Sequence, residues 1–278
     1  IAALAGAAVV TLAGLVYGQQ IGVSSLFLPS LAAAFGFAAT LGLPSWWLTR
    51  LAQRPAADGG PATSGQLLVW IAILVVLPVI LMVVVASLHF GSYDEAAAAV
   101  ARRIEPLLKD SLDRSGAKLP PDFDAKEWAA WVPRAMPAFA AASAVIMMAA
   151  NLWMAGRVAV MSQAFPRPWP DIAFELAAPR GLMLVFAAAV LAAFAGGLFG
   201  AVALIVALSL GAVFALIGLA VVHALLRDSA GRAPMLIGLY LFMGLLFPFP
   251  LILLLPLGLA ETALGLRAGK AGSRQTRT

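Results

Sequence analysis

The stretch NLWMAGRVAVMSQAFPRPWPDIAFELAAPR, from Asn151 to Arg180, decides how this chain is organised. It is the place where long apolar segments meet a dense set of polar and aromatic residues. An apolar helix that carries Asn151 continues to Arg157, and the sequence then breaks at the Pro-Arg-Pro-Trp-Pro run at 166–170. Each proline fixes its own φ and biases the preceding residue towards extended backbone, so the run predicts a rigid turn. Apolar sequence resumes after Arg180.

The composition indicates that lipid is the solvent of these apolar segments. Of the 278 residues, 63% are hydrophobic and 11% are charged, and the mean hydropathy is +0.97. Soluble domains usually carry about 25% charged residues. We therefore expect an all-α integral membrane protein, a polytopic bundle of about seven to eight transmembrane segments of about 20 residues each. The expected location is the bacterial inner (cytoplasmic) membrane, with the lipid bilayer as the first partner.

The basic balance of the chain, +5 at neutral pH, predicts its orientation. Outside 91–134, the lysines and arginines lie in short stretches that flank apolar runs, as the positive-inside rule describes for cytoplasmic ends. Basic faces with interleaved aromatics are not found, so no nucleic-acid partner is expected. The chain has no cysteine, which excludes disulfide and thiolate chemistry.

Apolar runs long enough to cross a membrane recur along the chain. The expected spans are Ile1 to Tyr17, Ile21 to Thr49 with kinks at Pro29 and Pro44, Gln66 to Leu88, Met136 to Val160, Gly181 to Ala195, and Ala201 to Leu226. The run from Pro234 to Leu266 is either one long kinked helix or two short ones hinged at 247–250. Two are favoured, because an even number of crossings keeps the basic tail inside. Since Ile1 lies within an apolar run, further helices are expected upstream.

One segment, Gly91 to Arg134, reads as a water-exposed insertion on the outer face. It holds eight acidic and seven basic residues. Tyr93 to Ser115 is expected to be an amphipathic helix, and Asp124 to Val132 a second short helix. The apolar face of the first helix is expected at Val100, Ile104, Leu107, Leu108 and Leu112, and Trp128 and Trp131 share one face of the second. The domain prediction is a single transmembrane domain, 1–266, that contains this insertion, followed by a basic cytoplasmic tail, 267–278.

Polar residues at the inner ends of the spans are the candidates for a ligand site or a structural latch. The set is Asn151, Arg157, Arg167, Trp169, Asp171, Arg180, His223 and Glu261. Asp171 is expected to cap the helix that follows it, with Arg157 folding back towards Asp171 or Glu175. Arg167 and Arg180 would complete an ion-pair cluster, and Trp169 would lie flat against the bundle end.

Three of these candidates lie within apolar helices. Asn151 is explained by an interhelical hydrogen bond of about 0.6 kcal/mol. His223 bonds a carbonyl or a carboxylate, or senses protons or ligand beside Glu261. Because a charged residue at mid-bilayer costs about 2.5–3.5 kcal/mol, Glu261 must be near the interface, protonated or paired. Its candidate partners are Arg267, His223 and Arg232.

Three motifs carry a resemblance to a known family: NLWMAGRVAVMSQAFPRPWPD, LIGLAVVHALLRDSAGRAPMLIGLYLFMGLL from Leu216 to Leu246, and the ending LPLGLAETALGLR. The chain resembles the YybS-like family of uncharacterised bacterial inner-membrane proteins from about Pro44 onward. The matching residues are Asn151, Trp153, Ala155, Arg167, Pro168, Trp169, Pro170, Asp171, Gly218, Leu219, Ala220, His223, Gly258, Leu259 and Arg267. Glu261 stands where the family pattern has Asp.

The resemblance implies a distant similarity to the substrate-binding components of energy-coupling-factor transporters. A small-molecule-binding or transport component is therefore the first functional hypothesis. The alternative is a non-transport scaffold or assembly factor that docks partners through the outer amphipathic segment. In either case the small residues of the apolar spans provide faces for partner membrane helices. Motifs of catalytic, metal or phosphate sites are not found, so neither an enzyme nor a cofactor is expected, and the sequence names no ligand.

Overall fold

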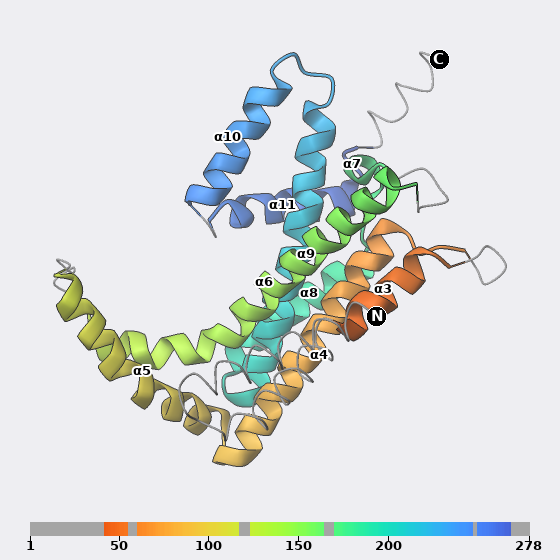
Figure 1. Ribbon diagram of the computed structural model, residues 1–278. Helices are drawn as coiled ribbons and strands as arrows, with labels where there is room; N and C mark the ends of the chain where they lie inside the picture. Colours follow the sequence, from red (N-terminus) through yellow and green to blue (C-terminus); the bar gives the residue numbers. More distant parts are fainter. Residues whose placement is uncertain (1–41, 55–59, 117–122, 164–169, 247–248, 268–278) are drawn as a thin grey trace, which may run out of the picture.

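The computed structural model describes residues 42–54, 60–116, 123–163, 170–246 and 249–267, and over these residues it contains helices and no strand (Figure 1). In chain order they are α3 (Leu43–Ala52), α4 (Ser64–Phe90), α5 (Tyr93–Ser115), α6 (Ala125–Met161), α7 (Ile172–Glu175), α8 (Gly181–Ala192), the 3-10 turn η4 (Ala193–Ala195), α9 (Gly197–Leu226), α10 (Arg232–Leu245) and α11 (Phe249–Leu264). The all-α class is confirmed for this part of the chain.

Three of the described helices, α4, α6 and α9, are long and apolar enough to cross a membrane. The segment 181–195, α10 and α11 are apolar but shorter. With 14 residues in α10 and 16 in α11, these helices are about 21 and 24 Å long, less than the hydrocarbon core of about 30 Å. The expected count of seven to eight spans is therefore not confirmed by the described residues. The expected span 1–17, and most of the next, lie outside the described residues.

Helix α9 is the centre of the bundle. Helices α4, α6, α8 and α11 all pack against it, and Figure 1 shows it running through the middle of the structure. Phe214, Ile217 and Val221 on α9 are completely buried. A helix that is hydrophobic all round is stable only when other helices or lipid surround it. Most of the surface of α9 is covered by other parts of the protein.

Two glycines bring α9 and α11 into backbone contact. A Cβ on Gly218 would lie 2.0 Å from the carbonyl oxygen of Leu254, and one on Gly258 would lie 1.8 Å from that of Phe214. No side chain larger than hydrogen fits at either position. This is the close approach that small residues permit between membrane helices.

The run after Pro234 forms two helices, as favoured from the sequence. Helix α10 begins at Arg232 and α11 ends at Leu264. The expected hinge falls partly on 247–248, which lie outside the described residues. Pro44, expected to kink a span, instead lies in the first turn of α3. A proline is harmless there, because the first amides of a helix have no partner within it.

The largest difference from the expected elements is α6. The short helix predicted at Asp124 to Val132 and the span predicted from Met136 are one continuous helix of 37 residues, with Pro133 and Pro137 inside it. A proline in such a helix is tolerated where other donors satisfy the freed carbonyls. Arg134 lies between the two prolines, and its Nη1 donates to the carbonyl of Ala130 at 2.9 Å.

Helix α5 and the start of α6, residues 93–116 and 123–139, form an arm that projects to one side of the bundle (Figure 1). The Tyr93 hydroxyl donates to the carbonyl of Arg134 at 2.7 Å, and Arg134 Nε donates to Asp94 at 3.2 Å. These bonds fix the base of the arm. Along the expected apolar face of α5, Ile104, Leu108 and Leu112 are partly buried, whereas Val100 and Leu107 are exposed. Ala96 and Ala97, near the start of the helix, are buried.

Candidate functional site

The short helix α7 is the point at which polar contacts from three other helices converge. It lies just after the proline-rich run, and its first contact is with α11. The guanidinium of Arg267 donates from Nη1 to the carbonyl of Ala173 at 2.7 Å and from Nη2 to that of Leu176 at 2.6 Å. These carbonyls lie within and directly after α7, where helix C-termini favour a cation.

The same arginine forms a buried ion pair with Glu261. Arg267 Nε lies 2.9 Å from Oε1 of Glu261, in ionic rather than hydrogen-bond geometry, and its backbone amide donates to Oε2 at 3.1 Å. The two side chains are 4% and 9% exposed. Gly265, with φ of +65°, turns the chain back so that both contacts form within one short segment. Of the three partners proposed for Glu261, the structure selects Arg267.

The second contact of α7 is with α9. Arg227 pairs bidentately with Asp171: Nη2 lies 2.6 Å from Oδ1, and Nη1 bonds Oδ2. The Arg227 guanidinium also lies over the ring of Phe174, 4.8 Å from its centroid. The hydrogen bonds to Asp171 raise the pKa of Arg227 above its usual value.

The third contact joins α7 to the start of α4. The hydroxyl of Ser64 donates to the carbonyl of Glu175 at 3.1 Å. A Cβ on Gly65 would lie 1.7 Å from the carbonyl oxygen of Ala177, so the two backbones touch. We call α7 with Asp171, Arg227, Glu261 and Arg267 the latch. It joins α4, α9 and α11 at one end of the bundle.

Asp171 does not cap α7 in the expected way. It occupies the N-cap position, but its side chain makes no cap hydrogen bond and pairs with Arg227 instead. A charge-assisted bidentate pair is stronger than a bond to a neutral amide, which explains the preference. Glu175 closes the turn from the other side, since its Oε1 accepts from the Asp171 amide at 3.0 Å.

Arg157 and Arg180 do not form the ion pairs with Asp171 or Glu175 that were expected of them. Arg157 and Arg180 are exposed, and the ion pair of Asp171 is with Arg227. Asn151 is also exposed on α6, so the interhelical hydrogen bond expected for it is not observed among the described residues. Arg167 and Trp169 lie outside the described residues.

His223 takes the first of its two expected roles. Its Nδ1 lies 2.9 Å from the carbonyl of Leu219, and its Nε2 lies 3.1 Å from the hydroxyl of Tyr240. A carbonyl can only accept, so Nδ1 is the donor to Leu219, and the other ring nitrogen bonds the Tyr240 hydroxyl. His223 therefore links α9 to α10, and the pairing with Glu261 is taken by Arg267.

The sequence does not reveal the central role of Arg227, which belongs to one of the short basic stretches that flank apolar runs. It names Arg267 only as one of three candidate partners of Glu261, and the domain prediction assigns this arginine to the basic tail 267–278. Arg267 in fact belongs to the bundle, because it is buried against Glu261. The available signal was the single acid in the apolar run of α11, followed six residues later by a base across a glycine.

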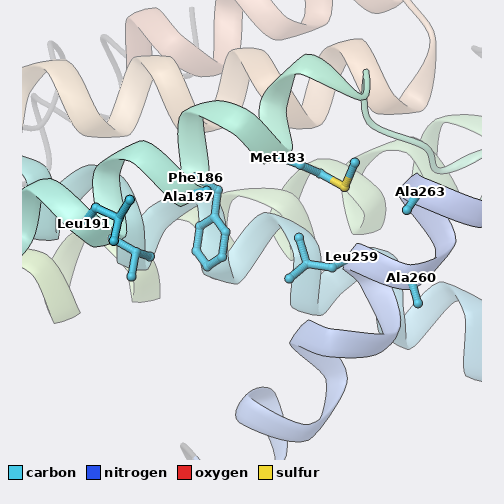
Figure 2. A pocket seen from close by; sticks show the side chains of 8 residues that line it. Met183, Phe186, Ala187, Leu191, Leu259, Ala260 and Ala263 are labelled. Atoms are coloured by element: carbon cyan, nitrogen blue, oxygen red, sulfur yellow. The ribbon is translucent and has the colours of Figure 1, made fainter.

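A groove of about 650 Å³ lies between α8 and α11 (Figure 2). Its lining consists of Met183, Phe186, Ala187, Val190, Leu191, Leu259, Ala260 and Ala263. Figure 2 shows Met183 and Phe186 along α8 with Leu259 and Ala260 across from them on α11. No lining residue carries a polar side chain, so the groove offers a polar solute no side-chain hydrogen bond.

Among the described residues, no three potential metal ligands of the His, Asp and Glu type lie together. The comparisons with protein-family models, curated proteins and solved structures found no match to this chain.

Proposed function

We propose that the protein is a multi-pass protein of the bacterial inner membrane that acts as a non-transport scaffold or assembly factor. In this proposal the arm lies on the outer face and docks a partner membrane protein, and the latch end lies in the cytoplasm. The observation that carries the proposal is a row of aromatic rings along the arm.

The row consists of Phe123, Trp128, Trp131 and Phe139. Successive ring centroids are 5.9, 5.9 and 6.3 Å apart. Trp128 is 50% exposed and Trp131 52% exposed. Large aromatic side chains dominate the binding energy of protein interfaces, and here they lie on a helix whose base is fixed by Tyr93 and Arg134. Because the fold already holds this surface in place, it loses little conformational entropy when a partner binds.

Two further observations support a scaffold over a solute-binding subunit. The charged side chains buried among the described residues, Glu261 and Arg267, bind one another and the ends of α7. The groove between α8 and α11 is apolar. A site for a vitamin-like solute needs several converging polar groups. The YybS-like resemblance implies a solute-binding role instead. The detection of a bound solute in the purified protein would favour that role.

The proposal is tested by native mass spectrometry of the protein extracted in a mild detergent. A partner protein should accompany the wild type and the control Lys126→Ala/Glu127→Ala, which changes two exposed charges at the start of the same helix. It should be lost from Trp128→Ala/Trp131→Ala. A bound solute, or a partner that the tryptophan variant retains, contradicts the proposal.

The orientation is tested separately in spheroplasts, using the absence of cysteine in the natural chain. A membrane-impermeant maleimide should label Ser115→Cys at the tip of α5 without permeabilisation, and Arg54→Cys, just after α3, only after it. The reverse pattern places the arm in the cytoplasm and rules out an outer docking surface.

A further inference from the structure

One exposed cation lies close in the sequence to the groove between α8 and α11. Arg180 is not one of the lining residues, but it immediately precedes α8, three residues before Met183 and seven before Ala187, so helix spacing puts it on the same face as these two lining residues. Its side chain is exposed, and it has no ion-pair partner among the described residues. This spacing places the Arg180 charge about one helical turn before Met183, the first lining residue of α8.

We propose that this groove is a binding site for one anionic phospholipid, with an acyl chain along α8 and α11 and the phosphate at Arg180. The charge pattern favours an anionic headgroup. Glu261 is the one carboxylate on α11, and its charge is neutralised by Arg267. No free negative charge of α8 or α11 therefore opposes a phosphate beside Arg180.

The volume of the groove favours a lipid chain over a transmembrane helix as its occupant. A helix about 30 Å long and 10–12 Å across fills roughly 2,400–3,400 Å³, several times the groove volume of about 650 Å³. An acyl chain is far thinner and more flexible than a helix. The alanines at 187, 260 and 263 make room for it where larger side chains would fill the space.

The headgroup, not the chain, must provide the selectivity. The bilayer interior is as apolar as the groove, so an acyl chain gains little by leaving other lipids. One basic residue at a membrane surface contributes about 1 kcal/mol to the binding of anionic lipid, which corresponds to about fivefold in affinity. The site should therefore prefer an anionic to a zwitterionic headgroup by about fivefold, and this preference should depend on Arg180.

The test uses the full chain in nanodiscs of equimolar phosphatidylglycerol and phosphatidylcholine, with retained lipids identified by native mass spectrometry. The wild type should retain one lipid and favour phosphatidylglycerol about fivefold. Arg180→Gln should abolish the preference, whereas Arg157→Gln, which removes another exposed arginine, should keep it. Ala187→Phe and Ala263→Phe should lose the lipid, and Ala188→Phe, which lies outside the groove, should retain it. Thermal melts of each variant show whether the bundle is intact.

Several outcomes overturn the proposal. If Arg180→Gln leaves the headgroup preference unchanged, Arg180 is not part of the site. Lipid retained by both groove-filling variants places the lipid elsewhere. A dimer that Ala263→Phe abolishes makes the groove an interface between two copies of this chain. If added palmitate displaces phosphatidylglycerol at equal concentration, the site does not select for the phosphate group.

Discussion

Arg267 and Asp171 tie α7 to the bundle at two different points: Arg267 donates to carbonyls within and just after the helix, and Asp171, at its N-cap, pairs with Arg227. Arg267 bonds the carbonyls of Ala173 and Leu176, 94 and 91 positions earlier, and Asp171 pairs with Arg227, 56 positions later. A helix of four residues has no stability of its own. Helix α7 therefore exists because these contacts with α9 and α11 hold it.

Replacing Arg267 by alanine should destabilise the bundle strongly. Glu261 would remain buried without its partner, and breaking a buried pair in this way costs about 3–5 kcal/mol. The double variant Glu261→Leu/Arg267→Met removes both charges and should recover a large part of the loss. Thermal melts in one detergent give the comparison. Equal melting temperatures for the wild type and Arg267→Ala would show that the pair does not stabilise the latch.

The pair of Asp171 and Arg227 should matter much less. Its side chains are 39% and 25% exposed, and pairs of this exposure contribute about 0.2–1 kcal/mol. Asp171→Asn should therefore lower the free energy of unfolding by less than about 1 kcal/mol, and added salt should shrink the difference. Chemical unfolding at low and high salt measures this. A loss as large as that of Arg267→Ala would make Asp171 the main support of α7.

The contact between α9 and α11 predicts a sharp difference among glycines. Gly258→Ala would place a methyl group 1.8 Å from the Phe214 carbonyl oxygen, and overpacking of this kind costs about 1–3 kcal/mol. Gly238→Ala on α10 meets nothing within 4 Å and should be neutral or slightly stabilising, since alanine favours helix. Melting temperatures that fall equally in both variants would argue against the close packing of α9 on α11.

Tyr93 predicts a pH dependence at the base of the arm. Burial is the main cause that raises the pKa of its hydroxyl above 10.0, so folding favours the neutral form. Its contribution to stability is full below about pH 10 and decreases as the pH rises through the folded-state pKa. Below pH 10, Tyr93→Phe should lose about 0.5–1.5 kcal/mol, the usual net value of one hydrogen bond. The gap between wild type and variant should close at higher pH, and a gap that widens there would contradict this assignment.

The sequence was sufficient for features that depend on local pattern. Hydrophobic runs predicted the helical class, the apolar segment 181–195 and the division of the last run into α10 and α11. The lone acid Glu261 in an apolar helix predicted a partner, and Arg267 was among the three candidates. Each of these follows from the cost of leaving polar groups unpaired in an apolar medium.

Other features depend on contacts between distant segments. Arg227 is as suitable for an interface anchor as for a partner of Asp171, and only the packing of α7 on α9 decides between them. The continuity of α6 through Pro133 and Pro137 likewise depends on its packing against α4, α5 and α9. Gly218 and Gly258 read as ordinary small residues until the crossing of α9 and α11 is known.

The most direct test of the docking role is photo-crosslinking from the aromatic row in native membranes. A photoreactive amino acid at Trp131 should give one discrete protein adduct, whereas the same amino acid at Ser111, an exposed polar position on α5, should give none. Adducts at Trp131 that contain only lipid would identify the aromatic row as a membrane anchor and contradict the proposal that it docks a partner protein.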